Sequence, residues 1–139
     1  MKFGQTIMAT LLLTLSASAM AELVFEDPWS PLAPPGRTMA GFMALNNTGD
    51  EPIVLVDGRS PQFGRIEIHD MFNDEGVMRM RRLDQLVIAP DERVTLKSGS
   101  FHIMLMEPQA SFTPGDEIEL VLLDEAGQQY ATRLEVRQR

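Results

Sequence analysis

Turn-forming residues recur at short intervals along this chain, and their spacing limits what it can fold into. Clusters of Gly, Pro, Asn and Asp separate short runs of β-branched or alternating apolar residues. Five clusters tolerate a tight or left-handed backbone: Asn46–Pro52, Asn73–Gly76, Lys97–Ser100, Thr113–Asp116 and Asp124–Gly127. The runs between them suit strands and have no long amphipathic stretch of helical period, so we predict an all-β sandwich or barrel.

The apolar runs predict nine strands. They are expected at Leu23–Glu26, Thr38–Asn46, Ile53–Asp57, Arg65–Met71, Val77–Arg81, Arg93–Lys97, Phe101–Met106, Glu117–Leu123 and Tyr130–Val136. The Pro-rich segment Pro28–Gly36, between the first two strands, is expected to form a rigid loop because proline fixes the backbone and removes a hydrogen-bond donor.

The first 21 residues have the features of an export signal. Lys2 supplies a positive charge, Ile7–Leu15 is a mostly apolar run, and Ala19-Met20-Ala21 resembles a cleavage site. We predict a signal peptide at residues 1–21, cleaved after Ala21, followed by a single domain at residues 22–139. The apolar run is too short for a transmembrane helix and no later segment is long enough, so no membrane span is expected.

Charge and cysteine content exclude several functions. The chain has 12 Lys and Arg against 20 Asp and Glu, which gives a formal net charge of −8. An acidic domain is repelled by phosphate backbones, so nucleic acid is not expected as a partner. The chain contains no cysteine. A blue-copper electron-transfer site needs a cysteine thiolate, so that function is excluded, and any soft-metal site must be built without thiolate.

Both histidines of the chain lie on predicted strands among methionines. His102, Met104 and Met106 alternate with Ile103 and Leu105. Side chains alternate between the two faces of a strand, so the histidine and the two methionines should share one face while the aliphatic residues point into the core.

A predicted hairpin brings the other histidine among methionines as well. With a turn at Asn73–Gly76 whose glycine is left-handed, His69 would pair with Met80 and Met71 with Met78. All four side chains would then lie on one face of the hairpin.

A combination of histidine and methionine without cysteine is selective for copper. Thioether sulfur is a soft, neutral ligand that prefers Cu(I), and imidazole suits copper in either oxidation state. Zinc usually takes cysteine, histidine and carboxylate, and hard cations take oxygen. Neutral donors also hold Cu(I) less tightly than thiolates would, which suits an ion that is later given away.

The spacing of four of these residues resembles a known family motif. His69, Met80, His102 and Met104 stand in the pattern H-x10-M-x21-H-x-M, the signature of the periplasmic PCu(A)C copper chaperones. Further segments resemble the same family, and the likeness covers nearly the whole predicted domain: Asn46–Pro52, Ile66–Met71, Gly76–Arg81 and Ser98–Glu107.

This resemblance implies a fold, a cargo and partners. The fold would be a cupredoxin-like Greek-key β-barrel or sandwich, and the protein would bind one Cu(I) per chain and not be an enzyme. The ligand roles would fall to His69, Met80, His102 and Met104. The protein would be periplasmic and deliver copper to the Cu(A) centre of cytochrome c oxidase subunit II, with a thiol-bearing copper or redox assembly protein as a second partner.

Two other functions remain open. A periplasmic copper scavenger or tolerance protein would use the same site without an oxidase recipient. A β-sandwich module for adhesion or ligand binding would need no metal at all.

The methionines beside the motif have two interpretations. Met71, Met78 and Met106 either pack in the core or rim, or shield the metal and its sulfur ligands from water. Asp70 stands where some family members have a methionine directly after the first histidine. The C-terminal segment Glu135–Arg139 contains no histidine or methionine, unlike the tail of some members that binds a second copper, so one site is expected.

Overall fold

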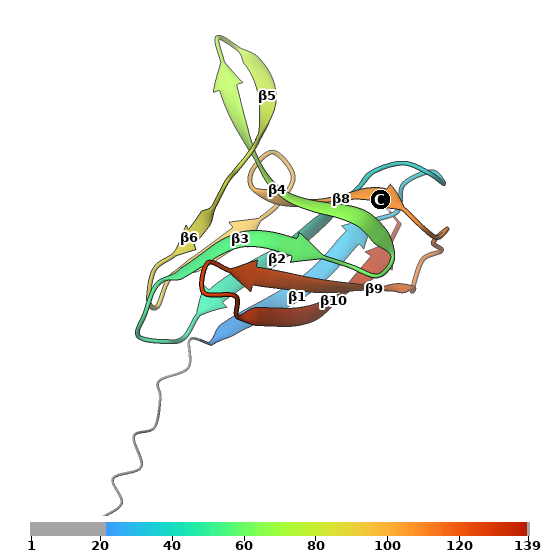
Figure 1. The fold of residues 1–139 in the computed structure, drawn as a ribbon. Helices are drawn as coiled ribbons and strands as arrows, with labels where there is room; N and C mark the ends of the chain where they lie inside the picture. The colour runs from blue at the N-terminus through green and yellow to red at the C-terminus, as the bar shows by residue number, and fades with distance from the viewer. Residues whose placement is uncertain (1–21, 139) are drawn as a thin grey trace, which may run out of the picture.

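The computed structural model describes residues 22–138, and all of their helix or strand structure is β-strand (Figure 1). The all-β prediction is therefore confirmed. The predicted signal peptide and its cleavage site fall at residues 1–21, outside the described residues. The strands are β1 (Leu23–Pro31), β2 (Met39–Asn47), β3 (Ile53–Arg59), β4 (Phe63–Asp74), β5 (Val77–Arg82), β6 (Leu86–Ile88), β7 (Arg93–Leu96), β8 (His102–Pro108), β9 (Glu117–Asp124) and β10 (Gln129–Arg137).

These strands form an open sheet that curls around a core. Their order is β5-β4-β8-β2-β1-β10-β9-β3-β6, and β7 pairs with β2 off this path. β1 and β10 are parallel, whereas the other pairs are antiparallel. Along one edge β2 changes partner, because Met39–Gly41 pair with β8 and Met43–Asn46 pair with β7. The sheet therefore divides at β2, and β8, β4 and β5 form the branch that carries both histidines.

The core is built from the inward-facing positions of most strands. Met39 and Met43 of β2 are 4% and 3% exposed and pack within it. The side chains with less than 2% exposure are Leu45, Ile53, Leu55, Ile88, Leu96, Ile103, Leu105, Ile118, Leu120, Leu122, Leu134 and Val136. Burying each aliphatic side chain of this size contributes about 1.5–3 kcal/mol to folding, so the sheet that carries the histidines has an apolar support.

The Pro-rich segment is not wholly the loop that its composition predicts. β1 runs on to Pro31, and Trp29–Pro31 pair in parallel with Glu135–Arg137 of β10. The pairing of β1 with β2 shifts between Glu26 and Trp29, where Asp27 has a φ of 45°. This irregularity lets the strand pass Pro28, since a residue in a bulge needs no ladder N–H group.

One strand escapes prediction altogether. β6 is three residues long, with Leu86 and Ile88 buried on either side of the exposed Val87. Three residues are too few for a recognisable alternation, and this strand is identified only by its pairing with β3. Within residues 22–138 there is no helix with the length and apolar character needed to cross a membrane.

Candidate metal centre

The two histidines face each other across adjacent strands. His69 of β4 is the direct pairing partner of His102 of β8, and their ring centroids are 5.7 Å apart. His102 is 4% exposed, and the side chain of His69 is 13% exposed. The fold therefore places two imidazoles from distant positions of the chain side by side in a largely dry environment.

Each imidazole uses one ring nitrogen in a hydrogen bond and leaves the other free. His102 Nδ1 donates to the carbonyl oxygen of Ser100 at 3.0 Å, and His69 Nε2 donates to Glu67 Oε2 at 2.7 Å. The remaining nitrogens, His69 Nδ1 and His102 Nε2, are buried and have no partner among the described residues. Buried polar atoms are normally paired, so two orphaned nitrogens on facing rings suit a bound metal.

Glu67 is held in its ionised form by its surroundings. The hydrogen bond from His69 is the largest influence that lowers the pKa of this carboxyl, and the positive charges of Arg65 and Arg82 lower it further, against the effect of burial. Arg65 Nε lies 3.4 Å from Glu67 Oε1, so the two carboxylate oxygens have different partners. An ionised carboxylate only accepts hydrogen bonds, and the shared proton therefore belongs to His69 Nε2.

Met104 lies beside the histidine pair. It is two residues from His102 on the same face of β8 and pairs with Glu67, while Ile103 and Leu105 are fully buried in the core. The alternation predicted for this strand is therefore confirmed. Met106 lies one step further along the same face, opposite Arg65, and is partly buried.

The register of the β4–β5 hairpin differs from the prediction by two residues. His69 pairs with Arg82, not Met80, and Met80 pairs instead with Met71. The turn consists of two residues, Glu75 and Gly76, with φ values of 51° and 88°. Such a turn joins the strands more tightly than the longer one expected, and a glutamate at positive φ is uncommon, so composition did not reveal it.

A shift of two residues preserves which face each side chain occupies. Met71, Met78 and Met80 still share the face of His69, as predicted, but Met80 now lies one pair closer to the hairpin tip. The hairpin projects away from the rest of the sheet (Figure 1). At its end Met78 and Met80 are 51% and 48% exposed. The structure thus brings His69, His102 and Met104 together and leaves Met80 on a projecting arm.

Two groups at this site, the Glu67 carboxylate and the Ser100 carbonyl, were not predicted from the sequence. Glu67 precedes His69 by two residues on one strand, and the i, i+2 spacing of a strand was enough to place it on the same face. The carbonyl of Ser100 has no sequence signature, because any residue supplies one. Among residues 22–138 no three His, Cys, Asp or Glu side chains are grouped as a metal site.

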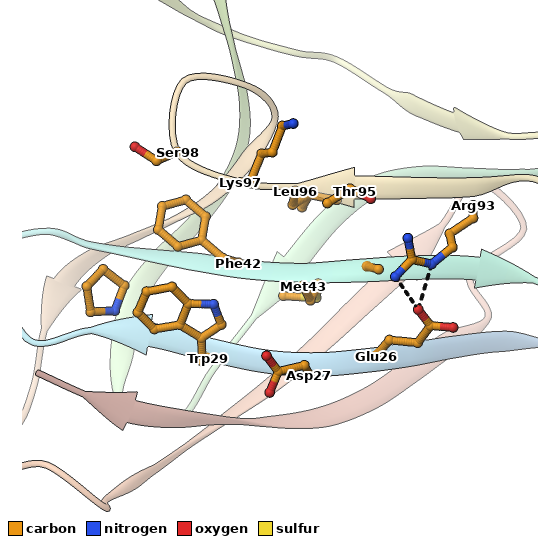
Figure 2. A pocket seen from close by; sticks show the side chains of 12 residues that line it. Glu26, Asp27, Trp29, Phe42, Met43, Arg93, Thr95, Leu96, Lys97 and Ser98 are labelled. Carbon is orange, nitrogen blue, oxygen red and sulfur yellow. Dashed lines mark hydrogen bonds and ion pairs between the residues drawn. The ribbon is translucent and has the colours of Figure 1, made fainter. Parts of the chain in front are cut away.

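A separate groove of about 610 Å³ lies over β1, β2 and β7 (Figure 2). Trp29 and Phe42 line it with ring centroids 5.5 Å apart, and the Glu26–Arg93 ion pair, at 2.6 Å, forms another part of its lining. Its lining contains no histidine, and Met43 there is buried in the core. The groove is therefore distinct from the candidate metal centre.

The chain matches one protein family over nearly all of its described residues. Residues 23–136 match the family described as LpqE-like lipoproteins. The chain belongs to the LpqE-like family. "Uncharacterized protein RP573" from Rickettsia prowazekii (strain Madrid E) is 35% identical over 107 residues, or 73% of this chain. The chain spans 59% of the length of that relative.

Solved structures that include two PCuAC domains share the fold of this LpqE-like chain, in agreement with the predicted resemblance. The Cu(I) form of DR1885 from Deinococcus radiodurans has a TM-score of 0.70 at 24% identity, covering 90% of this chain and 84% of that one. The copper-bound PCuAC domain from PmoF2 has a TM-score of 0.68 at 21% identity, covering 84% and 93%. The apo PCuAC domain from PmoF1 has 0.69 at 20%, covering 84% and 94%. These likenesses confirm the predicted cupredoxin-like fold.

Proposed function

We propose that this protein binds one Cu(I) through His69, His102, Met104 and Met80 and delivers it to the Cu(A) centre of cytochrome c oxidase subunit II. The observation that carries this proposal is the pair of buried ring nitrogens without partners, His69 Nδ1 and His102 Nε2, on facing histidines. Leaving a buried polar atom unpaired costs about 1–3 kcal/mol, a cost that a bound metal would remove.

The donor set supports copper over other metals. Two imidazoles lie beside the thioether of Met104, Met80 lies on the same face, and the chain has no cysteine. Thioethers prefer Cu(I), whereas zinc takes thiolate, imidazole or carboxylate ligands and calcium and magnesium take oxygen ligands. The DR1885 and PmoF2 structures of the same fold were solved with copper bound, which supports the same cargo here.

The exposure of the donors suggests how the copper is released. His102 is buried, whereas Met80 is 48% exposed on the hairpin. We therefore expect an acceptor to displace Met80 first and the histidines last, so that ligands are exchanged one at a time and the ion is never free. Thiolates hold Cu(I) more tightly than thioethers, so transfer to a reduced, cysteine-bearing Cu(A) site is favourable.

We propose that this protein transports copper and is not an enzyme. Two imidazoles are fewer than a superoxide-dismutase-like copper site uses, and a blue-copper site would need a cysteine. We propose an exported, periplasmic protein, in accord with its signal-like N-terminus and the lipoprotein description of its family. A thiol-bearing assembly protein would keep the acceptor cysteines reduced during transfer.

Copper transfer tests the proposal directly. Residues 22–139 should bind one equivalent of Cu(I) in competition with a chromogenic chelator under reducing conditions. On mixing with a reduced apo Cu(A) domain, the copper should move to the acceptor. Retention of copper by this protein, with the acceptor cysteines verified as reduced, would indicate a copper scavenger. Failure to bind Cu(I) at all would favour the metal-free module.

A further inference from the structure

We propose that the two histidines bind copper through different ring nitrogens, Nδ1 of His69 and Nε2 of His102, and that Glu67 is the positioning residue for His69. This inference rests on the proposed function and deepens it. In the sequence the two histidines are equivalent as donors. In the structure His69 forms its hydrogen bond through Nε2 and His102 forms its hydrogen bond through Nδ1, so each has a different ring nitrogen free.

The chemistry of the two acceptors determines which nitrogen is free. The carbonyl oxygen of Ser100 and the carboxylate oxygen of Glu67 face these ring nitrogens at 3.0 and 2.7 Å, and oxygens of both kinds accept hydrogen bonds and cannot donate them. A neutral imidazole carries one N–H, so that of His102 must be on Nδ1 and that of His69 on Nε2. The lone pairs are then left on His102 Nε2 and His69 Nδ1, the two buried atoms without partners.

The surroundings of Glu67 fix its carboxylate against Nε2 of His69. The Glu67 side chain is 12% exposed. One of its oxygens accepts the 2.7 Å hydrogen bond from His69, and Arg65 lies near the other oxygen. A carboxylate behind a metal-binding imidazole fixes the ring orientation and raises its basicity. His102 has only a backbone carbonyl in the equivalent place, so the two donors differ in strength as well as in the nitrogen that they present.

The difference between the two free ring nitrogens affects where a metal bound to both histidines would lie. Nδ1 is bonded to Cγ near the backbone, whereas Nε2 lies at the far end of the ring. A metal shared by His69 Nδ1 and His102 Nε2 would therefore lie nearer to β4 than to β8. That displacement moves it toward the β4–β5 hairpin, which carries Met80.

Nitrogen NMR of the histidine rings in the metal-free protein at pH 8 tests the assignment without copper. The wild type should show His69 protonated on Nε2, with a proton protected from exchange, and His102 protonated on Nδ1. Glu67→Leu should lose the protected His69 proton and keep that of His102. Asp70→Asn is the matched control, because Asp70 is the sequence neighbour of His69 that pairs with Arg81 on the other face. A wild-type His69 protonated on Nδ1 would overturn the proposal.

Copper binding supplies the second readout. Adding Cu(I) should shift the NMR signals of His69 Nδ1 and His102 Nε2, while His69 Nε2 and His102 Nδ1 keep their protons. Glu67→Leu should weaken Cu(I) binding about 10–100-fold, and Glu67→Gln, which can still accept the hydrogen bond, should recover part of the loss. Unchanged affinity in Glu67→Leu would refute the positioning role. Absence of Cu(I) binding by the wild type would refute the proposed function, and the metal-free spectra would still decide whether Glu67 fixes His69.

Discussion

The position of Met80 makes a quantitative prediction about the order of the sulfur ligands. Strands lie about 4.8 Å apart and rise about 3.3 Å per residue. Met80 and Met104 are two strands and four residue positions apart, so their Cα atoms would be about 16 Å apart on a flat sheet. A methionine sulfur reaches about 4 Å from its Cα and a metal–sulfur bond adds about 2.3 Å, so two methionines sharing a metal span at most about 13 Å.

The hairpin must therefore bend by about 3 Å or more toward β8 before Met80 and Met104 can bind the same copper. Met104 needs no such change, because it already lies beside His69 and His102. Part of the binding energy of Met80 is spent on bending the hairpin. Met104→Leu should consequently weaken Cu(I) binding at least about tenfold more than Met80→Leu, a difference of about 1.4 kcal/mol.

Competition titration with a Cu(I) chelator measures this difference. Met106→Leu and Met78→Leu are the matched controls, because each changes the neighbouring methionine on the same strand and face. Both controls, and Met71→Leu, should have smaller effects than either proposed ligand. Equal losses for Met80→Leu and Met104→Leu would mean that the hairpin is already closed in the metal-free protein, and the reasoning from register would be refuted.

Three further predictions concern the site and the fold. Cu(I) affinity should fall as the solution is made more acidic, because protons compete with the metal for the ring nitrogens; a chelator titration that stayed flat into acid would exclude the histidines as ligands. Tyr130→Phe should lower the free energy of unfolding by about 1–3 kcal/mol, since Tyr130 donates a 2.9 Å hydrogen bond to Asp124. Burial and Asp124 raise the pKa of Tyr130 from 10.0 to about 12, so this stabilisation is present below pH 10 and lost as the pH rises through about 12. Denaturant melts should show this loss of stability in the wild type but not in Tyr130→Phe. Asn47→Ala should cost about 2–4 kcal/mol, because the buried Asn47 side chain donates to the carbonyls of Ile88 and Glu51; a loss in urea melts of under about 1 kcal/mol would contradict this.

The local features of the fold follow from the sequence. The glycines of four predicted turns, Gly76, Gly99, Gly115 and Gly127, all have positive φ between 81° and 92°. Glycine has no Cβ to clash in that region, so its place in a turn cluster predicts the conformation directly. Strand alternation is equally local, which is why the faces occupied by His102 and its neighbours were predictable.

Pairings between distant segments did not follow in the same way. The end of β1 pairs with β10, at the other end of the chain, and this pairing turns part of a Pro-rich segment into a strand. The hairpin register depended on Glu75 adopting a left-handed φ of 51°, against its usual preference. At the end of β1, pairing with a distant strand therefore outweighed the local preference of the residues, whereas the hairpin departs from the expected register at a turn residue of its own.

The sequence by itself determined which donors this protein has and which faces of their strands they occupy, because residue chemistry and the two-residue period of a strand are local properties. Only the tertiary structure decided that His69 lies opposite His102 and that Met80 lies out on the hairpin arm. It also decided which nitrogen of each imidazole is free, through Glu67 and the carbonyl of Ser100. Those features depend on strand pairing and on individual hydrogen bonds, which form only when the sheet is assembled.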